Sequence, residues 1–174
     1  SIGEEMLRPT RIYVRPVLDI LGRYRVKKVI KALAHITGGG LPGNLPRVLP
    51  DGLTVRIKRN SWRTPPIFDL IAAKGPVDSL EMLRVFNMGV GFVMIVAPTF
   101  AKPIMDRLCR LGERCWVLGK VRKGGPDLMW VEVSHKPLDW TGPQEVTYFA
   151  LQAWRRESIL GFRRGPRKEC LGIA

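Results

Sequence analysis

Short apolar stretches of two kinds predict strands in this chain. Residues 53–58 alternate apolar and charged side chains with the two-residue period of a half-buried strand. Residues 90–97 form a continuous apolar run, which is typical of a buried strand and too short to cross a membrane. Further strands are predicted at 32–37, 115–121 and 128–133, and an extended segment at 9–15.

Prolines, glycines and capping residues predict the helices. Pro16 suits the first turn of a helix that ends near Leu21, because its φ angle is fixed and its missing N–H is tolerated there. Asp78 is placed to cap a short helix over 79–85. A further helix is predicted from a cap at Thr64 to about Lys74. Other helices are predicted at the start of 26–36, after Asn44 as an N-cap, and over 99–111.

The order of these elements predicts the fold class and a division of the chain. Strands and helices mix without strict alternation, which favours an α/β (α+β mixed) fold, a layered mixed sheet with packed helices. We expect this domain to occupy residues 1–133 and to remain folded when residues 134–174 are removed. Residues 134–174 are expected to form a basic tail with one amphipathic helix behind a capping-box spacing at 141–144. The apolar face of that helix would consist of Val146, Phe149, Ala150 and Ala153.

The net charge of +14 is spread along the chain rather than confined to the tail. A strongly basic surface favours polyanions, and nucleic acid is the obvious candidate. However, no nucleic-acid-binding motif accompanies the charge, and the cations are not interleaved with a series of aromatic residues. We therefore rank a solvated Arg-rich surface first, an anionic substrate second and nucleic acid third. For the basic cluster at 163–168 we likewise favour a solvated tail over a targeting signal or a nucleic-acid patch.

Patterns typical of metal sites and membrane spans are missing from the sequence. Cys109, Cys115 and Cys170 lack metal-ligand spacing, so they predict reduced thiols rather than a zinc site. No apolar run approaches the roughly 20 residues that a membrane-spanning helix needs, and the N-terminus does not resemble a signal peptide. We expect a cytoplasmic protein with no membrane partner and no metal ligands of its own.

The segment 34–49, AHITGGGLPGNLPRVL, carries the most chemical information. Its three consecutive glycines allow the backbone to turn sharply and to approach a ligand closely. Successive N–H groups in such a turn can cradle an anion, and a following helix N-terminus adds favourable partial charge. His35 and Thr37 would share one face of a strand beside this cradle. The segment therefore predicts a phosphate-handling site, although it lacks the GxxxxGK[ST] pattern of a P-loop.

Each side chain of this candidate site also has a purely structural interpretation. His35 is either a satisfied histidine at a strand end or a hydrogen-bond donor and proton carrier, and the adjacent glycines favour the second. Asn44 is either a helix cap or a ligand contact, and Arg47 is a ligand contact or a surface cation. Asn87 is at least as well explained by a turn before the next strand. The predicted site comprises His35 as the catalytic residue and Thr37, Gly38, Gly39, Gly40, Asn44 and Arg47 as substrate- or ATP-binding residues.

Several motifs together resemble the AIR synthetase family, the phosphoribosylformylglycinamidine cyclo-ligases of purine biosynthesis. The segment HITGGG followed by NLPRVLP resembles the signature of that family, and LRPTRIYV at 7–14 is similar to the segment that opens the second half of the enzyme. The resemblance covers residues 5–133, and several motifs in the right order are far more specific than one glycine loop. The other matching residues are Ser61-Trp62, Pro66-Ile67-Phe68, Glu81-Met82, FNMGVG at 86–91, Gly112-Glu113, Trp116 and Gly119.

The resemblance implies the C-terminal domain of a ligase that uses ATP to close the imidazole ring of aminoimidazole ribonucleotide from formylglycinamidine ribonucleotide. It implies contact with a nucleotide and a phosphoribosyl substrate. It also implies an N-terminal domain of the same enzyme that supplies the Mg²⁺ ligands, and a homodimer when the enzyme is complete. This part alone is then expected to be an inactive fragment. The alternative is a non-catalytic remnant of the fold that binds polyanions or acts as a scaffold.

Overall fold

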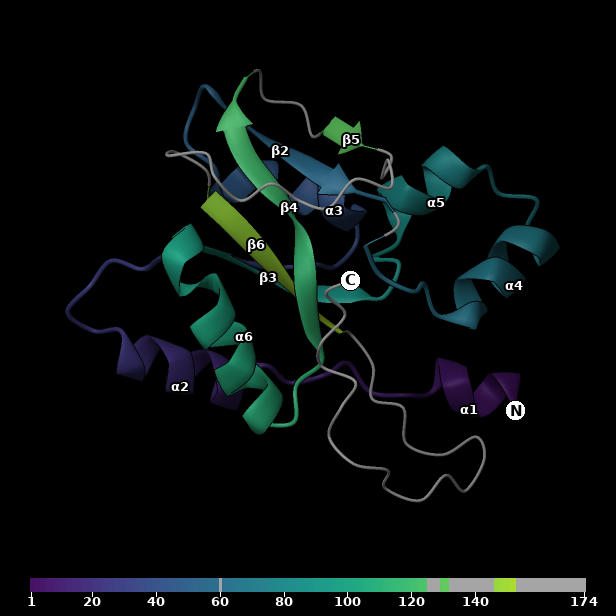
Figure 1. Ribbon diagram of the computed structural model, residues 1–174. Helices are drawn as coiled ribbons and strands as arrows, with labels where there is room; N and C mark the ends of the chain where they lie inside the picture. Colours follow the sequence, from purple (N-terminus) through teal and green to yellow (C-terminus); the bar gives the residue numbers. More distant parts are fainter. Residues whose placement is uncertain (60, 125–128, 132–145, 153–174) are drawn as a thin grey trace.

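The computed structural model describes residues 1–59, 61–124, 129–131 and 146–152, which form one six-stranded sheet with packed helices (Figure 1). The strand order is β1-β3-β6-β4-β2-β5, and all neighbours are antiparallel except β2 and β5. The predicted mixed α/β class is therefore confirmed. The strands are β1 (Ile30–His35), β2 (Leu53–Lys58), β3 (Val90–Val96), β4 (Cys115–Lys123), β5 (Met129–Val131) and β6 (Val146–Gln152).

Helices of five to ten residues connect and cover these strands. The helices are α1 (Ile2–Met6), α2 (Val14–Arg23), α3 (Gly40–Asn44), α4 (Pro66–Lys74), α5 (Ser79–Val85) and α6 (Ala101–Arg110), with 3-10 turns η1 (Pro46–Val48) and η2 (Pro98–Phe100). None of the helices in the described part of the chain is long and apolar enough to span a membrane.

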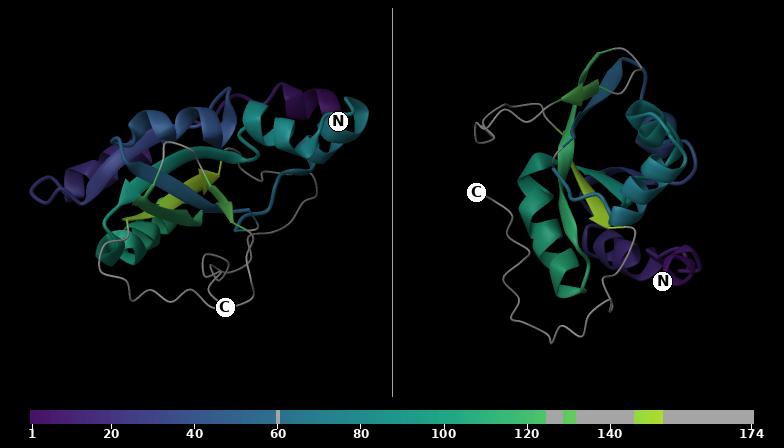
Figure 2. Two further views of the ribbon diagram at one scale, coloured as in Figure 1. Left: turned by 90° about the horizontal axis from the view of Figure 1, so that it is seen from above. Right: turned by 90° about the vertical axis from the view of Figure 1, so that its right-hand side faces the viewer.

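Strand β3 contributes to two hydrophobic clusters, one on each face of the sheet. Val93 and Ile95 pack with Leu41 of α3, whereas Met94 packs with Ile104 of α6. Figure 2 shows α6 on one side of the sheet and α3 with α5 on the other. The continuous apolar run at 90–97 is explained by this burial on both faces, since neither face of a covered strand can be polar.

The amphipathic helix predicted around Val146 is wrong, because residues 146–152 form strand β6. This strand lies inside the sheet, where it pairs with β3 on one side and β4 on the other. Two neighbouring strands supply hydrogen-bond partners along its backbone, and such tertiary pairing overrides a local helical pattern. The sheet therefore includes residues from both sides of the division proposed at Val133. The predicted capping box at 141–144, the basic cluster at 163–168 and Cys170 lie outside the described residues.

Elements with strong local signals occur where the sequence predicts them. Residues 53–58 form β2, and the Asp78 carboxylate accepts a hydrogen bond from the Leu80 N–H, 2.8 Å away, at the start of α5. The helix predicted at the start of 26–36 is wrong, because β1 begins at Ile30 and is set by its pairing with β3. Thr64 is not a cap either, since α4 begins after Pro65 without a side-chain hydrogen bond.

Candidate functional site

The glycine turn follows directly from the end of β1, an edge strand of the sheet. Ile36 is 1% exposed, and its N–H donates to the Gly91 carbonyl at 2.9 Å, which holds the chain against β3. Gly39 and Gly40 then take φ angles of +92° and +57°, which L side chains rarely adopt. These two residues reverse the chain and start α3 at Gly40.

Gly40 is required by packing rather than by an open ligand surface. A Cβ atom at this position would lie 2.3 Å from the Leu83 carbonyl oxygen and 2.8 Å from that of Phe86. Both oxygens belong to the C-terminal end of α5, so the turn is pressed against that helix. At Gly38, by contrast, a Cβ atom would meet nothing within 4 Å, and the residue is exposed.

Asn44 is not the N-cap of a following helix, as the sequence predicts, but the last residue of α3. Its amide nitrogen lies 2.7 Å from the Gly40 carbonyl, 3.2 Å from that of Gly38 and 3.5 Å from that of Thr37. The helix starts earlier than predicted because the two positive φ angles turn the chain at once. The side chain, 8% exposed, therefore points back at the turn and ties its carbonyl oxygens together.

The N–H groups of Gly38 and Gly39 make no hydrogen bond to other described residues, whereas the Gly40 N–H donates to the Thr37 carbonyl at 3.1 Å. His35 and Thr37 are both exposed and flank the buried Ile36, so they share the accessible side of the chain. Because Asn44 occupies the carbonyl oxygens, the groups left at this turn are hydrogen-bond donors. Such donors suit an anion.

Arg47 lies on η1 and is exposed. No described hydrogen bond or ion pair joins it to the glycine turn. The structure therefore brings His35, Thr37, Gly38 and Gly39 together, while Gly40 and Asn44 support the turn from behind.

Two aromatic rings hold His35, and the sequence reasoning assigned no role to either. The His35 ring lies edge-on to Tyr13 with centroids 5.8 Å apart, and it is tilted against Phe92 at 6.2 Å. Phe92 is directly opposite His35 in the β1–β3 pairing. The register of these two strands therefore places the Phe92 ring beside His35, and the sequence motifs alone did not indicate this. Tyr13 is 6% exposed, and burial raises the pKa of its phenol above the usual range.

A buried ion pair lies beyond Tyr13. The Arg11 guanidinium donates to a Glu113 carboxylate oxygen at 2.6 Å, and the side chains are only 14% and 7% exposed. The second atoms of this pair, Arg11 Nε and Glu113 Oε2, are buried and have no hydrogen-bond partner among the described residues, and the same holds for Trp116 Nε1. Sequence reasoning placed Arg11, Glu113 and Trp116 in family motifs but could not pair residues about one hundred positions apart.

Asn87 stabilises the turn before β3, which is the structural role that the sequence suggested for it. Its side-chain oxygen accepts from the Gly89 N–H at 2.9 Å, and the Trp62 indole donates to the Met88 carbonyl at the same distance. Met88 and Gly89 both have positive φ angles, and a Cβ at Gly89 would meet the Pro65 ring. This turn fixes the start of β3 and therefore the strand beside His35.

The mixed sheet, the glycine turn and the exposed histidine define an α/β domain whose free backbone donors suit an anionic ligand. Residues 1–131 match the family described as AIR synthase related protein, C-terminal domain, and the chain belongs to this family. The resemblance that the sequence motifs predicted is thereby confirmed.

Curated relatives carry the name phosphoribosylformylglycinamidine cyclo-ligase. The one from Syntrophus aciditrophicus is 46% identical over 123 residues, which cover 71% of this chain and 34% of that relative. The one from Pseudothermotoga lettingae is 50% identical over 124 residues, which cover 71% of this chain and 35% of that relative. The chain thus spans about a third of the length of the curated relatives that it matches.

Proposed function

We propose that this chain is the C-terminal domain of an ATP-dependent ligase that closes the imidazole ring of aminoimidazole ribonucleotide from formylglycinamidine ribonucleotide. The names of the relatives support this reaction, and the observation that carries it is the pair of unused N–H groups at Gly38 and Gly39 beside His35. Both the substrate and ATP carry phosphate groups. Fixed donors aimed at oxygen atoms need no reorganisation when negative charge develops on them.

The residues present fit part of this chemistry. The N–H groups of Gly38 and Gly39, with the side chains of His35 and Thr37, fit a phosphate or carbonyl oxygen, because all four can donate hydrogen bonds. They do not fit Mg²⁺, which prefers carboxylate oxygens. Among the described residues no cluster of His, Cys, Asp or Glu could hold a metal ion. Within this proposal the N-terminal domain supplies the Mg²⁺ ligands, as the family resemblance implies, and no step of this domain is routed through the metal.

Within this proposal, each residue of the turn has one task. ATP would supply the phosphoryl group that activates the formyl amide oxygen, so that this oxygen leaves as phosphate when the amidine nitrogen closes the ring. Gly38 and Gly39 bind an oxygen of the anionic group, and Thr37 adds a hydroxyl donor. His35 donates to the oxygen on which charge develops or carries a proton from the attacking nitrogen. Asn44 keeps the turn in the shape that exposes these donors.

The test is a single-chain chimera in which this sequence replaces the matching part of the Pseudothermotoga lettingae relative. We expect ring closure and ATP hydrolysis by the chimera and neither by the present chain alone. Activity of the purified chain alone, or a folded chimera that binds neither ATP nor substrate, would overturn the proposal.

His35→Ala in the chimera sharpens the test. We expect turnover to fall by about 10²-fold or more, the usual contribution of an acid–base group, with little change in melting temperature. Lys31→Ala is the matched control, because Lys31 is an exposed residue of the same strand. Equal activity of the two variants would assign His35 a structural role only.

The second candidate is a remnant of the fold that binds polyanions without catalysis. The high positive charge favours it. It predicts that the chimera binds phosphate compounds yet forms no product, so the same assay separates the two functions.

A further inference from the structure

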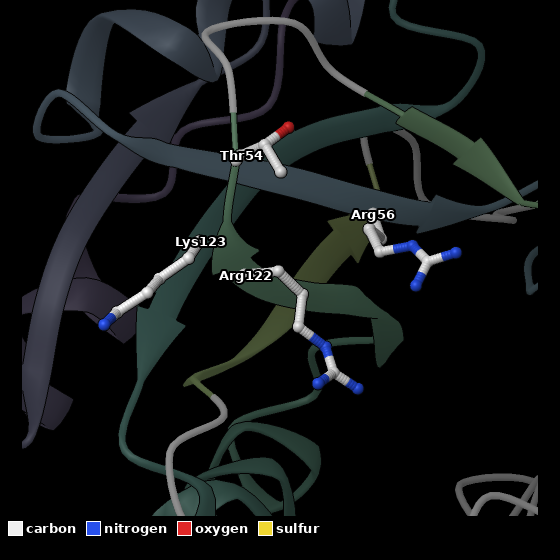
Figure 3. A pocket seen from close by; sticks show the side chains of 5 residues that line it. Thr54, Arg56, Arg122 and Lys123 are labelled. Carbon is white, nitrogen blue, oxygen red and sulfur yellow. The ribbon is translucent and has the colours of Figure 1, made fainter.

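Two groups of basic side chains lie outside the proposed active site. One consists of Arg56 and Lys58 of β2 with Lys120 and Arg122 of β4, and we call it the β2–β4 basic face. Figure 3 shows the guanidinium groups of Arg56 and Arg122 extended to the same side, whereas Lys123 points away from them. Lys120 and Arg122 both take part in interactions within the chain, so no further ligand is inferred for this face.

The second group lies between the end of α2 and the start of β1. Five of the nine residues from 23 to 31 are basic, and all five side chains are exposed. No acidic residue occurs between Asp19 and Asp51, so the sequence supplies no neighbouring counter-charge. We refer to these five residues as the α2–β1 basic loop: Arg23, Arg25, Lys27, Lys28 and Lys31.

The carboxylates of the helices beside this loop are already engaged. Both carboxylate oxygens of Asp19 accept hydrogen bonds from the Arg107 guanidinium, at 2.7 and 2.6 Å. Arg107 is accordingly the main cause of the lowered pKa of Asp19, and Arg23 contributes less. Asp106 of α6 lies 3.3 Å from Lys102. Among the ion pairs of the described residues, none includes a cation of the α2–β1 basic loop.

Contacts with η2 and β3 hold the loop in place. The Lys27 ammonium lies 5.8 Å from the centroid of the Phe100 ring, and the Tyr24 ring is edge-on to the same ring with centroids 5.6 Å apart. The Val29 N–H donates to the Lys27 carbonyl at 2.7 Å, and the Ala97 N–H donates to the Val29 carbonyl at 2.9 Å. The cations therefore project from a defined backbone, beside two aromatic rings that are only half-buried.

The loop is well separated from the glycine turn. Strand β1 begins at Ile30, beside the loop, and ends at His35, before the turn. Six residues of strand span about 20 Å. Figures 1 and 2 show the connection between α2 and β1 projecting from one side of the molecule, away from α4 and α5. A ligand of the loop therefore binds outside the proposed ring-closure site.

We propose that the α2–β1 basic loop binds a single-stranded nucleic acid through its phosphate backbone. Lysine and arginine side chains that neutralise successive phosphates supply affinity that does not depend on sequence. Aromatic rings beside such cations give the bases a surface on which to stack. Val26 is the one apolar side chain among the exposed residues of the loop, and this favours a polyanion over a lipid bilayer, whose binding requires buried apolar area. This inference goes beyond the ring-closure function and uses none of its residues.

The experiment measures binding of labelled single-stranded oligonucleotides of about 15 nucleotides, one of DNA and one of RNA, to the full 174-residue chain by fluorescence anisotropy. If all five cations contact phosphates, the logarithm of the binding constant should fall with the logarithm of the salt concentration with a slope of about −3.5. The variant Arg25→Gln, Lys27→Gln, Lys28→Gln should bind about tenfold or more weakly, with a slope less steep by about 2. Absence of binding, or unchanged affinity of this variant, would overturn the proposal.

Two control variants separate local charge from net charge and from loop structure. Lys74→Gln, Arg110→Gln, Arg114→Gln removes the same charge from exposed positions elsewhere and should retain affinity and slope. An equal loss in this control would show that only net charge matters, which contradicts a site at the loop. Lys27→Arg with Lys28→Arg keeps the charge and should also retain affinity, and a loss there would show that charge at the loop is not what binds.

Two other polyanions test the class of ligand. Polyphosphate of the same charge should bind more weakly than the oligonucleotides, because it has no bases to stack. Equal or tighter polyphosphate binding would reject a nucleic-acid site in favour of polyanions in general. Vesicles of phosphatidylserine and phosphatidylcholine should not compete with the oligonucleotide. Competition that disappears in the triple variant of the loop would assign the loop to an anionic membrane surface instead.

Discussion

The turn after β1 and the face of β2–β4 both present hydrogen-bond donors, but they obtain them differently. At the turn the donors are backbone N–H groups, and their direction depends on the positive φ angles of Gly39 and Gly40. On the β2–β4 face the donors are the side chains of Arg56 and Arg122, which extend from a regular pair of strands. Substitutions at Gly39 or Gly40 therefore disturb the backbone of the turn, whereas substitutions on the basic face change charge and leave the backbone intact.

This difference determines how specific each region can be. The turn is closed from behind by Asn44 and by the packing of Gly40 on α5, so only a small, fixed set of donors is exposed. Preorganised donors of this kind serve catalysis because they do not move as charge develops. The donors of the basic face lie at the ends of long, flexible side chains and are less fixed. Strand β6 lies between the β1–β3 pair that carries the turn and the β4–β2 pair that carries the basic face.

Removing β6 should have the largest effect. A chain that ends at Val133 loses the strand between β3 and β4, which separates the pair β1–β3 from the three strands β4, β2 and β5. We expect loss of cooperative unfolding and of hydrogen-exchange protection in β3 and β4, because a two-stranded unit is marginally stable and both strands lose a hydrogen-bonded neighbour. A chain that ends at Gln152 is the control and should keep its protection. Full protection in the shorter chain would show that β3 and β4 pair directly without β6.

Gly40→Ala tests whether the turn is coupled to packing. The added Cβ would lie 2.3 Å from the Leu83 carbonyl oxygen at a residue with a φ of +57°. We expect a loss of about 2–5 kcal/mol in the free energy of unfolding, from overpacking and from the left-handed backbone. Gly38→Ala is the control and should change stability by less than about 1 kcal/mol, since nothing lies near its Cβ. Denaturant titration of both variants would reveal equal losses if the coupling is absent.

Asn44→Ala should cost less, about 1–3 kcal/mol, because it removes the amide that ties the turn's carbonyl oxygens. Asn44→Asp keeps the shape and replaces the donor with an acceptor that faces those oxygens. It should therefore be at least as destabilising when measured by urea unfolding at pH 7. A milder effect of Asp than of Ala would show that shape, rather than hydrogen bonding, holds the turn.

Tyr13→Phe should have the smallest effect, and that effect should depend on pH. Burial raises the pKa of Tyr13, so the folded protein resists ionisation of the phenol. The stability due to the neutral phenol is fully present below the unfolded pKa of about 10 and is lost as pH rises above it, by up to about 1.4 kcal/mol per pH unit. The Phe variant should lose less stability between pH 9 and 11 in urea unfolding. Parallel pH profiles would show that Tyr13 ionises freely in the folded state.

Sequence reasoning succeeded where the signal was local or came from several motifs together. The alternation at 53–58 and the cap at Asp78 depend on residues within a few positions of each other, and both occur as predicted. The motifs from LRPTRIYV to FNMGVG identified the family. The residues of the candidate site remain predictions, and the structure adds that Gly40 and Asn44 support the turn from behind.

Sequence reasoning failed where partners lie far apart along the chain. The apolar spacing around Val146 is compatible with a helix, and only two neighbouring strands made the segment a strand. The Arg11–Glu113 ion pair and the ring of Phe92 beside His35 likewise depend on the register of the sheet.

The sequence by itself determined the family, the mixed α/β class and the position of the glycine turn, because each depends on residue type at short spacing. The tertiary structure alone decided that β6 joins the sheet, that Asn44 faces back toward the turn, and that four cations share one face of β2–β4. The physical reason is that strand register and burial are settled by contacts between segments distant in the chain, and a period of two or of 3.6 residues carries no information about which segment will be the neighbour.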